Sequence, residues 1–307
     1  MSNLPKEGRL LCLRRKDLLV IYLILFHYSN LYILKAKWVY MRYGLFADAH
    51  SNLEASKAVV EDAKLQSLNE WFFLGDIVGY YTNPNEVMDL FFDIIPESHF
   101  LIGNHDKAVA NVIKFKKENG KTPRAEHFNP LAEEAVRWNA EHLSEKNLKR
   151  LENLLLSNRY LISSQDTTKN LVFAHSTPFN PELMNYIQGR LDAQSTFFEK
   201  SYLSDNTLAF VGHTHVPQAY LNNKGAITCF DANLIAQCPI ICNLNEYQSA
   251  LFSIPSVGQP RDSRPEAGYA ILDTEKHYVQ FKRLSYDFKE TQRKAREEDL
   301  PKDLRLD

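Results

Sequence analysis

The sequence predicts an α/β fold in which a parallel first half is followed by antiparallel strands. Five short apolar runs are each bounded by polar or glycine residues, a pattern typical of buried strands. Helical patterns separate the first three runs, as expected for βαβ units that build a parallel sheet. Beyond His215 the chain alternates between short strand-like segments and tight turns, which favours antiparallel pairing. The five runs are residues 43–47, 71–74, 100–102, 171–174 and 208–211.

Length and composition indicate an ordinary folded protein. At 307 residues the chain could form one large domain or two. A hydrophobic fraction of 44% and a charged fraction of 24% exclude disordered, collagen-like and disulfide-scaffold classes. Lysine and arginine number 36 against 38 acidic residues, so no global field draws the protein to nucleic acid or anionic lipid. We therefore expect no nucleic-acid partner, and any recognition of phosphate must be local.

The four cysteines do not form a recognisable framework. They are too few and too unevenly spaced for a disulfide scaffold, and they lack paired zinc-type spacing. We interpret them as reduced thiols, and we expect a cytoplasmic protein. They are Cys12, Cys229, Cys238 and Cys242.

The N-terminal segment allows several interpretations. Residues 18–26 form an unbroken apolar run that follows three basic residues, the charge order of a signal anchor. Polar residues interrupt the run before residues 31–34, so residues 18–34 fall short of the roughly 20 apolar residues that span a bilayer. Because Met41 directly precedes the first good strand, residues 1–40 could be an appendage from an upstream start codon, a membrane anchor or a packed extra helix. We treat them as an extension to a domain over residues 41–307.

Helix start signals recur along the first half of the chain. A helix is predicted between residues 83 and 95, with proline in its first turn and Glu86 closing a capping box. Two later start signals predict helices that belong to an insertion over residues 107–158, after the third strand. The start signals are Asn83 with Pro84, Asn129 with Pro130, and Ser144.

The second half is predicted to form hairpins and a final helix. Glycine at position 225 suits a tight turn between two strands, and residues 273–276 suit another. The tail over residues 287–307 is dense in both charges and is predicted to be helical, with a solvated face. The predicted strands are residues 218–221, 226–230, 250–254, 269–272 and 278–284.

A polar motif follows each of the five apolar runs. Taken singly, each motif has an ordinary explanation, such as a capping aspartate, an Asn/Asp turn or a satisfied histidine. Together they supply carboxylates, a carboxamide and imidazoles at the carboxyl ends of strands, where open α/β sheets bind their ligands. Such a mixture suits divalent transition metals. The motifs are Asp48-Ala49-His50, Gly75-Asp76-Ile77-Val78-Gly79, Gly103-Asn104-His105-Asp106, His175 and Gly212-His213-Thr214-His215.

This order of motifs resembles the signature of calcineurin-like metallophosphoesterases. Residues 254–262, Ile-Pro-Ser-Val-Gly-Gln-Pro-Arg-Asp, look like the late loop of the bacterial and archaeal branch related to diadenosine tetraphosphatases and small phosphodiesterases. The resemblance extends from Met41 to the C-terminus, whereas residues 1–40 depart from it. It implies a four-layer α/β/β/α sandwich of two mixed β-sheets flanked by helices, which agrees with the parallel and then antiparallel pattern.

The resemblance also implies two metal ions and their ligands. Oxygen and nitrogen ligands mixed in this way favour manganese, iron or zinc over calcium. Asp76 would bridge the two ions. One ion would be held by Asp48, His50, Asp76 and His215, and the other by Asp76, Asn104, His175 and His213.

The expected mechanism is attack by a hydroxide held between the two ions, which also clamp the phosphoryl oxygens. His105 has no place in the implied ligand set, so we assign it to transition-state stabilisation and protonation of the leaving oxygen. Asp106 either orients His105 or caps the turn. Arg261 is a candidate phosphate contact because a guanidinium matches phosphate in a bidentate fashion, although it could be an ordinary surface arginine.

The predicted function is therefore a metal-dependent phosphoesterase that acts on a small phosphorylated or nucleotide substrate. The sequence leaves the choice between monoester and diester open, because loops decide specificity, and it leaves the oligomeric state open. The alternative is a catalytically silent, metal-binding scaffold for protein partners. Scaffolds of this fold tend to lack the histidine after the asparagine, which this chain has as His105.

Overall fold

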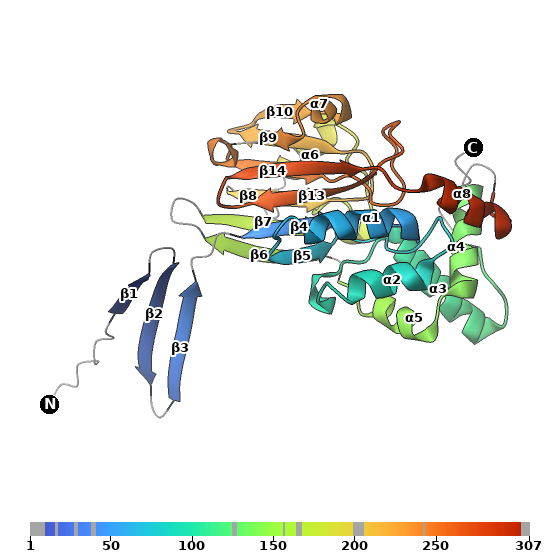
Figure 1. Ribbon diagram of the computed structural model, residues 1–307, viewed down its shortest axis with the longest axis horizontal. Helices are drawn as coiled ribbons and strands as arrows, with labels where there is room; N and C mark the ends of the chain where they lie inside the picture. The colour runs from blue at the N-terminus through green and yellow to red at the C-terminus, as the bar shows by residue number, and fades with distance from the viewer. Residues whose placement is uncertain are drawn as a thin grey trace.

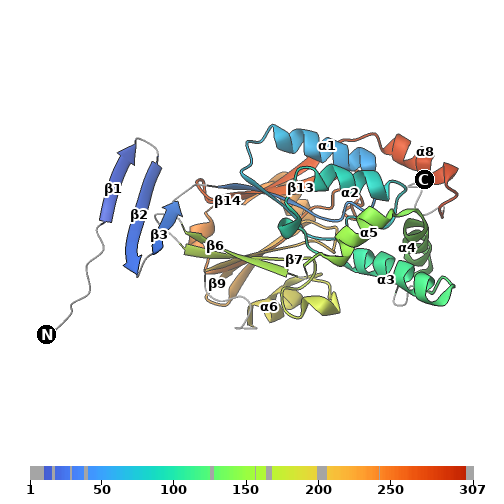
Figure 2. The ribbon, with the colours of Figure 1, turned by 90° about the horizontal axis from the view of Figure 1, so that it is seen from below.

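Two mixed β-sheets packed face to face form the centre of the molecule in the computed structural model (Figure 1). The structure describes residues 10–15, 18–27, 30–37, 41–124, 128–155, 157–163, 168–198, 206–241 and 243–301. Helices cover both outer faces: Figure 2 shows α1 and α2 on one side of the strands and α6 on the opposite side. The four-layer α/β/β/α sandwich of mixed sheets is confirmed.

The first sheet contains the strands that precede the first two motifs. Its order within the described residues is β11-β14-β13-β4-β5. β4 and β5 are parallel, with Phe46 opposite Phe73, whereas β13 runs antiparallel to β4 and to β14. The strands are β4 (Arg42–Phe46), β5 (Glu70–Phe73), β11 (Ile240–Ile241), β13 (Ala267–Asp273) and β14 (Tyr278–Leu284).

The second sheet contains the strands that precede the last two motifs. Its order in the described part of the chain is β10-β9-β12-β8-β7-β6. β7, β8 and β12 are parallel to one another, while the outer strands pair antiparallel. The strands are β6 (Ser157–Ser163), β7 (Thr168–Ala174), β8 (Thr207–Val211), β9 (Gln218–Asn223), β10 (Ala226–Phe230) and β12 (Ser249–Ser253).

Alternation along the strands builds the layers. Leu45 on β4 packs between the sheets with Phe173 and Phe252 of the second sheet, whereas its neighbour Phe46 packs outward against the helices. Val172 likewise points outward and packs with Phe197 of α6. Because successive side chains of a strand point to opposite faces, each strand serves one inner and one outer core.

The helices pack on these outer faces and at one end of the sandwich. α1 and α2 bury Val59, Val60 and Phe91 against the first sheet, and the helices of the expected insertion extend the same core. The helices are α1 (Leu53–Lys64), α2 (Pro84–Phe92), α3 (Asn104–Asn119), α4 (Pro130–His142), α5 (Glu145–Glu152), α6 (Arg190–Phe198), α7 (Ala232–Gln237) and α8 (Phe288–Glu297), with short 3-10 helices η1 (Glu97–His99), η2 (Pro181–Leu183) and η3 (Leu244–Glu246).

Two of the three predicted helix caps are confirmed. The Asn129 side chain accepts a hydrogen bond from the Ala132 N–H at 2.9 Å, and Ser144 accepts from the Asn147 N–H at 3.3 Å. The capping box of Glu86 is wrong, because Asn83 makes no side-chain cap at the start of α2. Its carboxamide oxygen instead accepts from Lys294 of α8 at 3.3 Å, so a tertiary contact replaces the local one.

The third apolar run forms less β-structure than predicted. Phe100 makes a single parallel bridge to Phe73, and Leu101 makes another to Leu155. The pairing stops there because α3 begins at Asn104. The predicted hairpin at Gly225 is confirmed, since residues 224 and 225 both have the positive φ angles, 52° and 90°, that a two-residue hairpin loop needs.

The N-terminal segment forms strands rather than the helix considered for it. The apolar run lies in β2 (Leu18–His27), which pairs antiparallel with β1 (Leu10–Arg15) and β3 (Asn30–Lys37). In the parts of the chain that the structure describes, no helix is long and apolar enough to cross a membrane.

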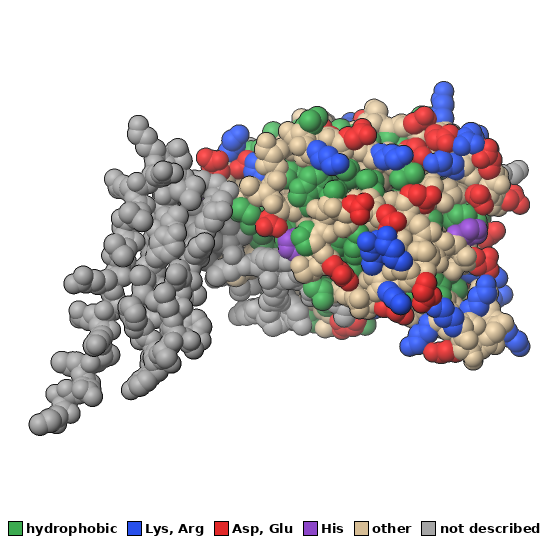
Figure 3. All heavy atoms as spheres, turned by 60° about the horizontal axis from the view of Figure 1, so that its bottom comes forward, with side chains coloured by type: hydrophobic (Ala, Val, Ile, Leu, Met, Phe, Trp, Pro, Cys, Tyr) green, Lys and Arg blue, Asp and Glu red, His purple; other side chains and the backbone are tan. Residues whose placement is uncertain are grey.

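The described cysteines and the charges on the surface agree with what the sequence predicts. Cys229 and Cys238 are free thiols, whereas the side chains of Cys12 and Cys242 lie outside the described residues. On the face in Figure 3, lysine and arginine side chains are intermixed with aspartate and glutamate, as expected for 36 basic and 38 acidic residues.

Candidate metal centre

The five motifs meet at one end of the sandwich, beside the carboxyl ends of strands from both sheets. Asp48 and His50 follow β4, and Asp76 follows β5 of the first sheet. His175 follows β7, and the His213 motif follows β8 of the second sheet. Asn104 is the first residue of α3. The sheet sandwich therefore brings together residues that are far apart in the chain.

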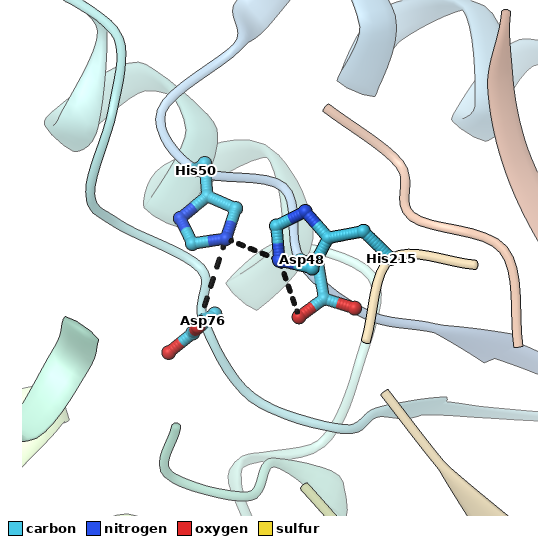
Figure 4. Close-up of side chains that lie close together, drawn as sticks. All are labelled: Asp48, His50, Asp76 and His215. Carbon is cyan, nitrogen blue, oxygen red and sulfur yellow. Dashed lines mark hydrogen bonds and ion pairs between the residues drawn. The ribbon is translucent and has the colours of Figure 1, made fainter. Parts of the chain in front are cut away.

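The buried acids and histidines form two groups that could each hold a metal ion. The first contains Asp48, His50, Asp76 and His215, and the second contains Asp76, His175 and His213, with ligand atoms in each group within 4.8 Å of one another. Figure 4 shows the first group, in which the Nε2 atoms of His50 and His215 lie 3.1 Å apart. Asp76 belongs to both groups, which is the position expected of a bridging carboxylate.

Distances within the second group place Asn104 beside it. The Nε2 atom of His175 lies 3.3 Å from the Asp76 carboxylate and 3.3 Å from the Asn104 Oδ1 atom. The His213 main-chain N–H donates to both carboxylate oxygens of Asp48 at 3.1 Å. The structure thus brings all seven predicted ligands into one cluster.

Much of this cluster has an unusual backbone conformation. Five of the seven residues lie in the left-handed region, which costs a residue other than glycine of order 1–3 kcal/mol. Strain of this kind persists where the surrounding structure imposes it, and it is concentrated at functional sites. The residues and their φ angles are Asp48 (57°), His50 (48°), Asp76 (56°), His213 (68°) and His215 (60°).

The imidazoles are oriented by main-chain carbonyl groups. His175 Nδ1 lies 2.8 Å from the Leu74 oxygen, and His213 Nε2 lies 2.9 Å from the Met184 oxygen. His215 Nδ1 lies 2.5 Å from the Gln259 oxygen. A carbonyl can only accept, so the nitrogen that faces it carries the hydrogen. In a neutral ring the opposite nitrogen is then bare, which is the arrangement of metal-binding histidines.

A buried carboxylate oxygen shows that a cation fits these residues. Asp76 Oδ2 lies 3.3 Å from His175 Nε2 and 3.6 Å from His50 Nε2, yet it makes no hydrogen bond in the described part of the chain. A buried carboxylate oxygen without a partner is costly, whereas a divalent cation would satisfy it. The set of carboxylate, carboxamide and imidazole donors suits manganese, iron or zinc.

Burial keeps most of the imidazoles neutral. It lowers the pKa of His50 and His215 well below the usual value and the pKa of His213 to about 3. These rings therefore present lone pairs at neutral pH, as ligands must.

Three other groups in the cluster have pKa values that shift in different directions. Burial raises the pKa of Asp48 to about 7. Burial also disfavours the charged form of Asp76, but His175 and His105 outweigh it and hold its pKa well below the usual range. Burial opposes charge on His175, yet Asp76 and Asp48 raise its pKa to about 9.

Asp106 holds the backbone of two motifs. Its carboxylate accepts hydrogen bonds from the N–H groups of Asp76 (2.8 Å), Val78 (3.1 Å) and Gly103 (2.9 Å). Burial raises its pKa to about 7, against the effect of the N–H groups. These contacts correspond to the capping role considered for Asp106. Among the described residues, His105 Nδ1 has no hydrogen-bond partner, so Asp106 does not orient the ring directly.

His105 lies against the first group of ligands. Its ring is 4.7 Å from the His50 ring and 4.6 Å from the Tyr80 ring, centroid to centroid. Phe128 covers another side at 4.8 Å. Burial lowers the pKa of His105 to about 4, so the imidazole is neutral at pH 7.

Arg261 lies at the rim of the cluster. Its Nη2 atom donates to the Tyr80 hydroxyl at 3.2 Å, and its Nε atom donates to Gln259 Oε1 at 3.0 Å. Its positive charge contributes to the lowered pKa of both His105 and His215. The guanidinium is therefore close enough to act on a group bound at the centre.

Sequence patterns did not reveal the aromatic and amide residues around the centre. Tyr186 stacks on His213, Tyr80 packs on His50 and His105, and Asn139 holds the loops behind them. None of these follows an apolar run within a polar motif. Only the extension of the second motif to Tyr80 could have indicated one of them.

Comparisons with known proteins agree on one family. The model for calcineurin-like phosphoesterases matches residues 41–217. The uncharacterized protein MJ0912 of Methanocaldococcus jannaschii is 33% identical over 261 residues, which cover 84% of this chain and 93% of that protein.

Solved structures show the same fold. A metallophosphoesterase from Sphaerobacter thermophilus is 30% identical, with a TM-score of 0.68 over 87% of this chain and 98% of that one. The hypothetical protein PH1004 from Pyrococcus horikoshii is 17% identical, with a TM-score of 0.64 over 86% of this chain and 96% of that one.

Proposed function

Because the chain belongs to the calcineurin-like phosphoesterase family, we propose that it is a metal-dependent enzyme that hydrolyses phosphomonoester or phosphodiester bonds. The observation that carries the proposal is the convergence of imidazole nitrogens on the Asp76 carboxylate. His50 and His175 approach Asp76 Oδ2 at 3.6 and 3.3 Å from opposite ligand groups, and that oxygen has no hydrogen bond from the described residues.

Two sets of residues would hold the ions. Asp48, His50, Asp76 and His215 would bind one, and Asp76, Asn104, His175 and His213 the other. When bound, two divalent cations, manganese, iron or zinc, would activate a water molecule and offset the charge that develops on the phosphoryl oxygens. The hydrogen bonds to Leu74, Met184 and Gln259 fix which imidazole nitrogen faces each ion.

Two further side chains would act on the substrate. His105 is neutral in the free protein, so its N–H would first donate a hydrogen bond to the phosphoryl group. The negative charge of that group would raise the pKa of His105, so that the ring takes up a proton from water and the resulting imidazolium protonates the leaving oxygen. Arg261, held by Tyr80 and Gln259, would contact a phosphate oxygen from the rim.

The test is hydrolysis of p-nitrophenyl phosphate and bis(p-nitrophenyl) phosphate with added manganese. We expect Asp76→Asn to abolish turnover of both esters, because it removes the carboxylate shared by both ligand groups. Asp62→Asn on α1 is the matched control, since it makes the same change outside the centre. For His105→Ala we expect full metal content and turnover lowered about 10²- to 10⁴-fold.

Two outcomes would reject parts of this proposal. Wild-type protein that binds manganese but hydrolyses neither ester would favour the scaffold alternative. Loss of metal from the His105→Ala variant would make His105 a ligand instead of an acid.

A further inference from the structure

Tyr186 covers one side of the second ligand group. It lies on the loop between η2 and α6, and its ring stacks on His213 with centroids 3.8 Å apart and an angle of 17° between the planes. Tyr80 packs on His50 and His105, at the first group. The two tyrosines therefore lie against different ends of the candidate centre, and Asp76 is shared between those ends.

The loop that carries Tyr186 is fastened to the centre. The Met184 carbonyl accepts the hydrogen bond from His213 Nε2, two residues before the tyrosine. Asn180 and Met184 both have left-handed backbone conformations, with φ of 49° and 51°. The Thr177 N–H donates to the Asn185 oxygen at 3.4 Å across the loop. The position of the ring is thus set by the centre itself.

The stacked ring is nevertheless open to solvent. Tyr186 is 43% exposed, whereas His213 beneath it is 3% exposed. Since the imidazole covers one face, solvent and ligands can reach the ring only at its opposite face and its edge. An aromatic ring held rigidly, with one face free beside a buried polar centre, is the arrangement that stacks planar ligands.

We propose that the free face of Tyr186 is a stacking platform for a planar aromatic group esterified to the phosphate that the centre holds. The inference rests on the proposed function and narrows its substrates to aryl or nucleobase phosphoesters. Arg261, at the Tyr80 end, attracts the anionic phosphate. The ester group that points away from Arg261 then reaches Tyr186.

The test is binding, measured by calorimetry on the manganese-loaded full chain with phosphonates that cannot be hydrolysed. Phenylphosphonate and methylphosphonate share the anion and differ in the ring. We expect Tyr186→Leu to weaken the binding of phenylphosphonate about 5- to 150-fold, as for the loss of one aromatic stack, and to change the binding of methylphosphonate less than twofold. Tyr186→Phe should keep the wild-type affinities. Leu183→Ala is the control, since Leu183 is an exposed apolar residue at the end of η2, directly before this loop.

The ratio of the two affinities decides the proposal. An equal loss of affinity for both phosphonates in Tyr186→Leu would mean that the tyrosine only positions His213. Unchanged affinity for both would mean that it neither stacks the ligand nor positions His213. A nucleoside 5′-phosphonate distinguishes a nucleobase from an aryl group as the stacked ring. Its binding is weakened by Tyr186→Leu only if a nucleobase reaches the platform. Failure of the proposed function would appear separately, as wild-type protein that binds these ligands and hydrolyses no ester.

Discussion

Asp76 is placed by contacts that leave one of its oxygens for a ligand. Its Oδ1 atom accepts a hydrogen bond from the His105 N–H at 2.8 Å, while Oδ2 faces the imidazoles. A β-carbon on Gly103 would lie 2.0 Å from that Oδ1 atom, so only glycine allows the carboxylate to sit there. The glycine of the third motif is therefore explained by the aspartate of the second.

At the residue scale we predict that metal binding competes with protons. His175, with its pKa raised to about 9, and Asp48, with its pKa raised to about 7, hold protons that a cation must displace. A group with a raised pKa keeps its proton up to a higher pH. The affinity for manganese should therefore rise with pH, by about tenfold per unit between pH 7 and 9, where His175 deprotonates. His50, His213 and His215 add nothing, since their pKa values lie lower.

The measurement is calorimetric titration of manganese at pH 8 in two buffers of different ionisation enthalpy. About one proton should be released per protein, and the His175→Asn variant should release only what Asp48 still holds. Identical heats in the two buffers for the wild type would show that no proton is displaced.

The insertion helix α4 supports the centre from behind. Its Asn139 is fully buried, and the carboxamide accepts from the Ser51 hydroxyl at 2.6 Å and from the Gly79 N–H at 3.3 Å. The same side chain donates to the carbonyls of Gly79, Tyr81 and Ala135. One amide thus joins the loop of His50 to the loop after Asp76.

At the element scale we predict that Asn139→Ala weakens manganese binding at least about tenfold and lowers the free energy of unfolding by about 2–4 kcal/mol, because several buried polar groups lose their partners. Asn147→Ala on α5 is the matched control. Asn147 is also buried, but its partners, Asn85 and Arg150, lie outside the centre. Manganese titration and urea unfolding of both variants check this, and an equal loss of metal affinity in the control would contradict it.

At the scale of the whole molecule, the two sheets are connected by a loop that passes the candidate metal centre. The late loop runs from β12 of the second sheet to β13 of the first, and its Val257 and Gly258 N–H groups donate to the Ala47 and Asp48 carbonyls at 2.9 Å. A β-carbon on Gly258 would lie 1.9 Å from the Ala49 oxygen, which explains the glycine. The same loop supplies the Gln259 carbonyl for His215.

At the scale of the molecule we predict that metal removal lowers thermal stability. Manganese bound to ligands from both sheets would stabilise the folded state by about 2.7 kcal/mol at a concentration 100 times its Kd. This corresponds to a Tm higher by roughly 5 °C for a domain of this size. Thermal unfolding with manganese or with a chelator measures the difference. The Asp76→Asn variant should show little of it, and a full shift in that variant would place the stabilising metal elsewhere.

Several elements could be predicted because their signals are local. Pro130 after Asn129, the glycine at 225 and the alternation along β13 and β14 act within a few residues, so sequence alone located these elements. The prediction of a capping box at Asn83 was wrong because Lys294, more than two hundred residues away, donates a hydrogen bond to the Asn83 side-chain oxygen. The third run ended early because α3 begins directly after it.

The sequence by itself determined the family of folds and, through its resemblance to that family, the seven residues that cluster at one point. Six of them follow apolar runs that form buried strands, whereas Asn104 follows a run that makes only isolated bridges. Only the tertiary structure decided that these strands belong to two different sheets, and that Tyr186 and Asn139 complete the centre. The physical reason is the sequence distance over which each interaction acts. Periodicity and capping act over a few residues, whereas the stacking of Tyr186 on His213 exists only after distant strands have packed.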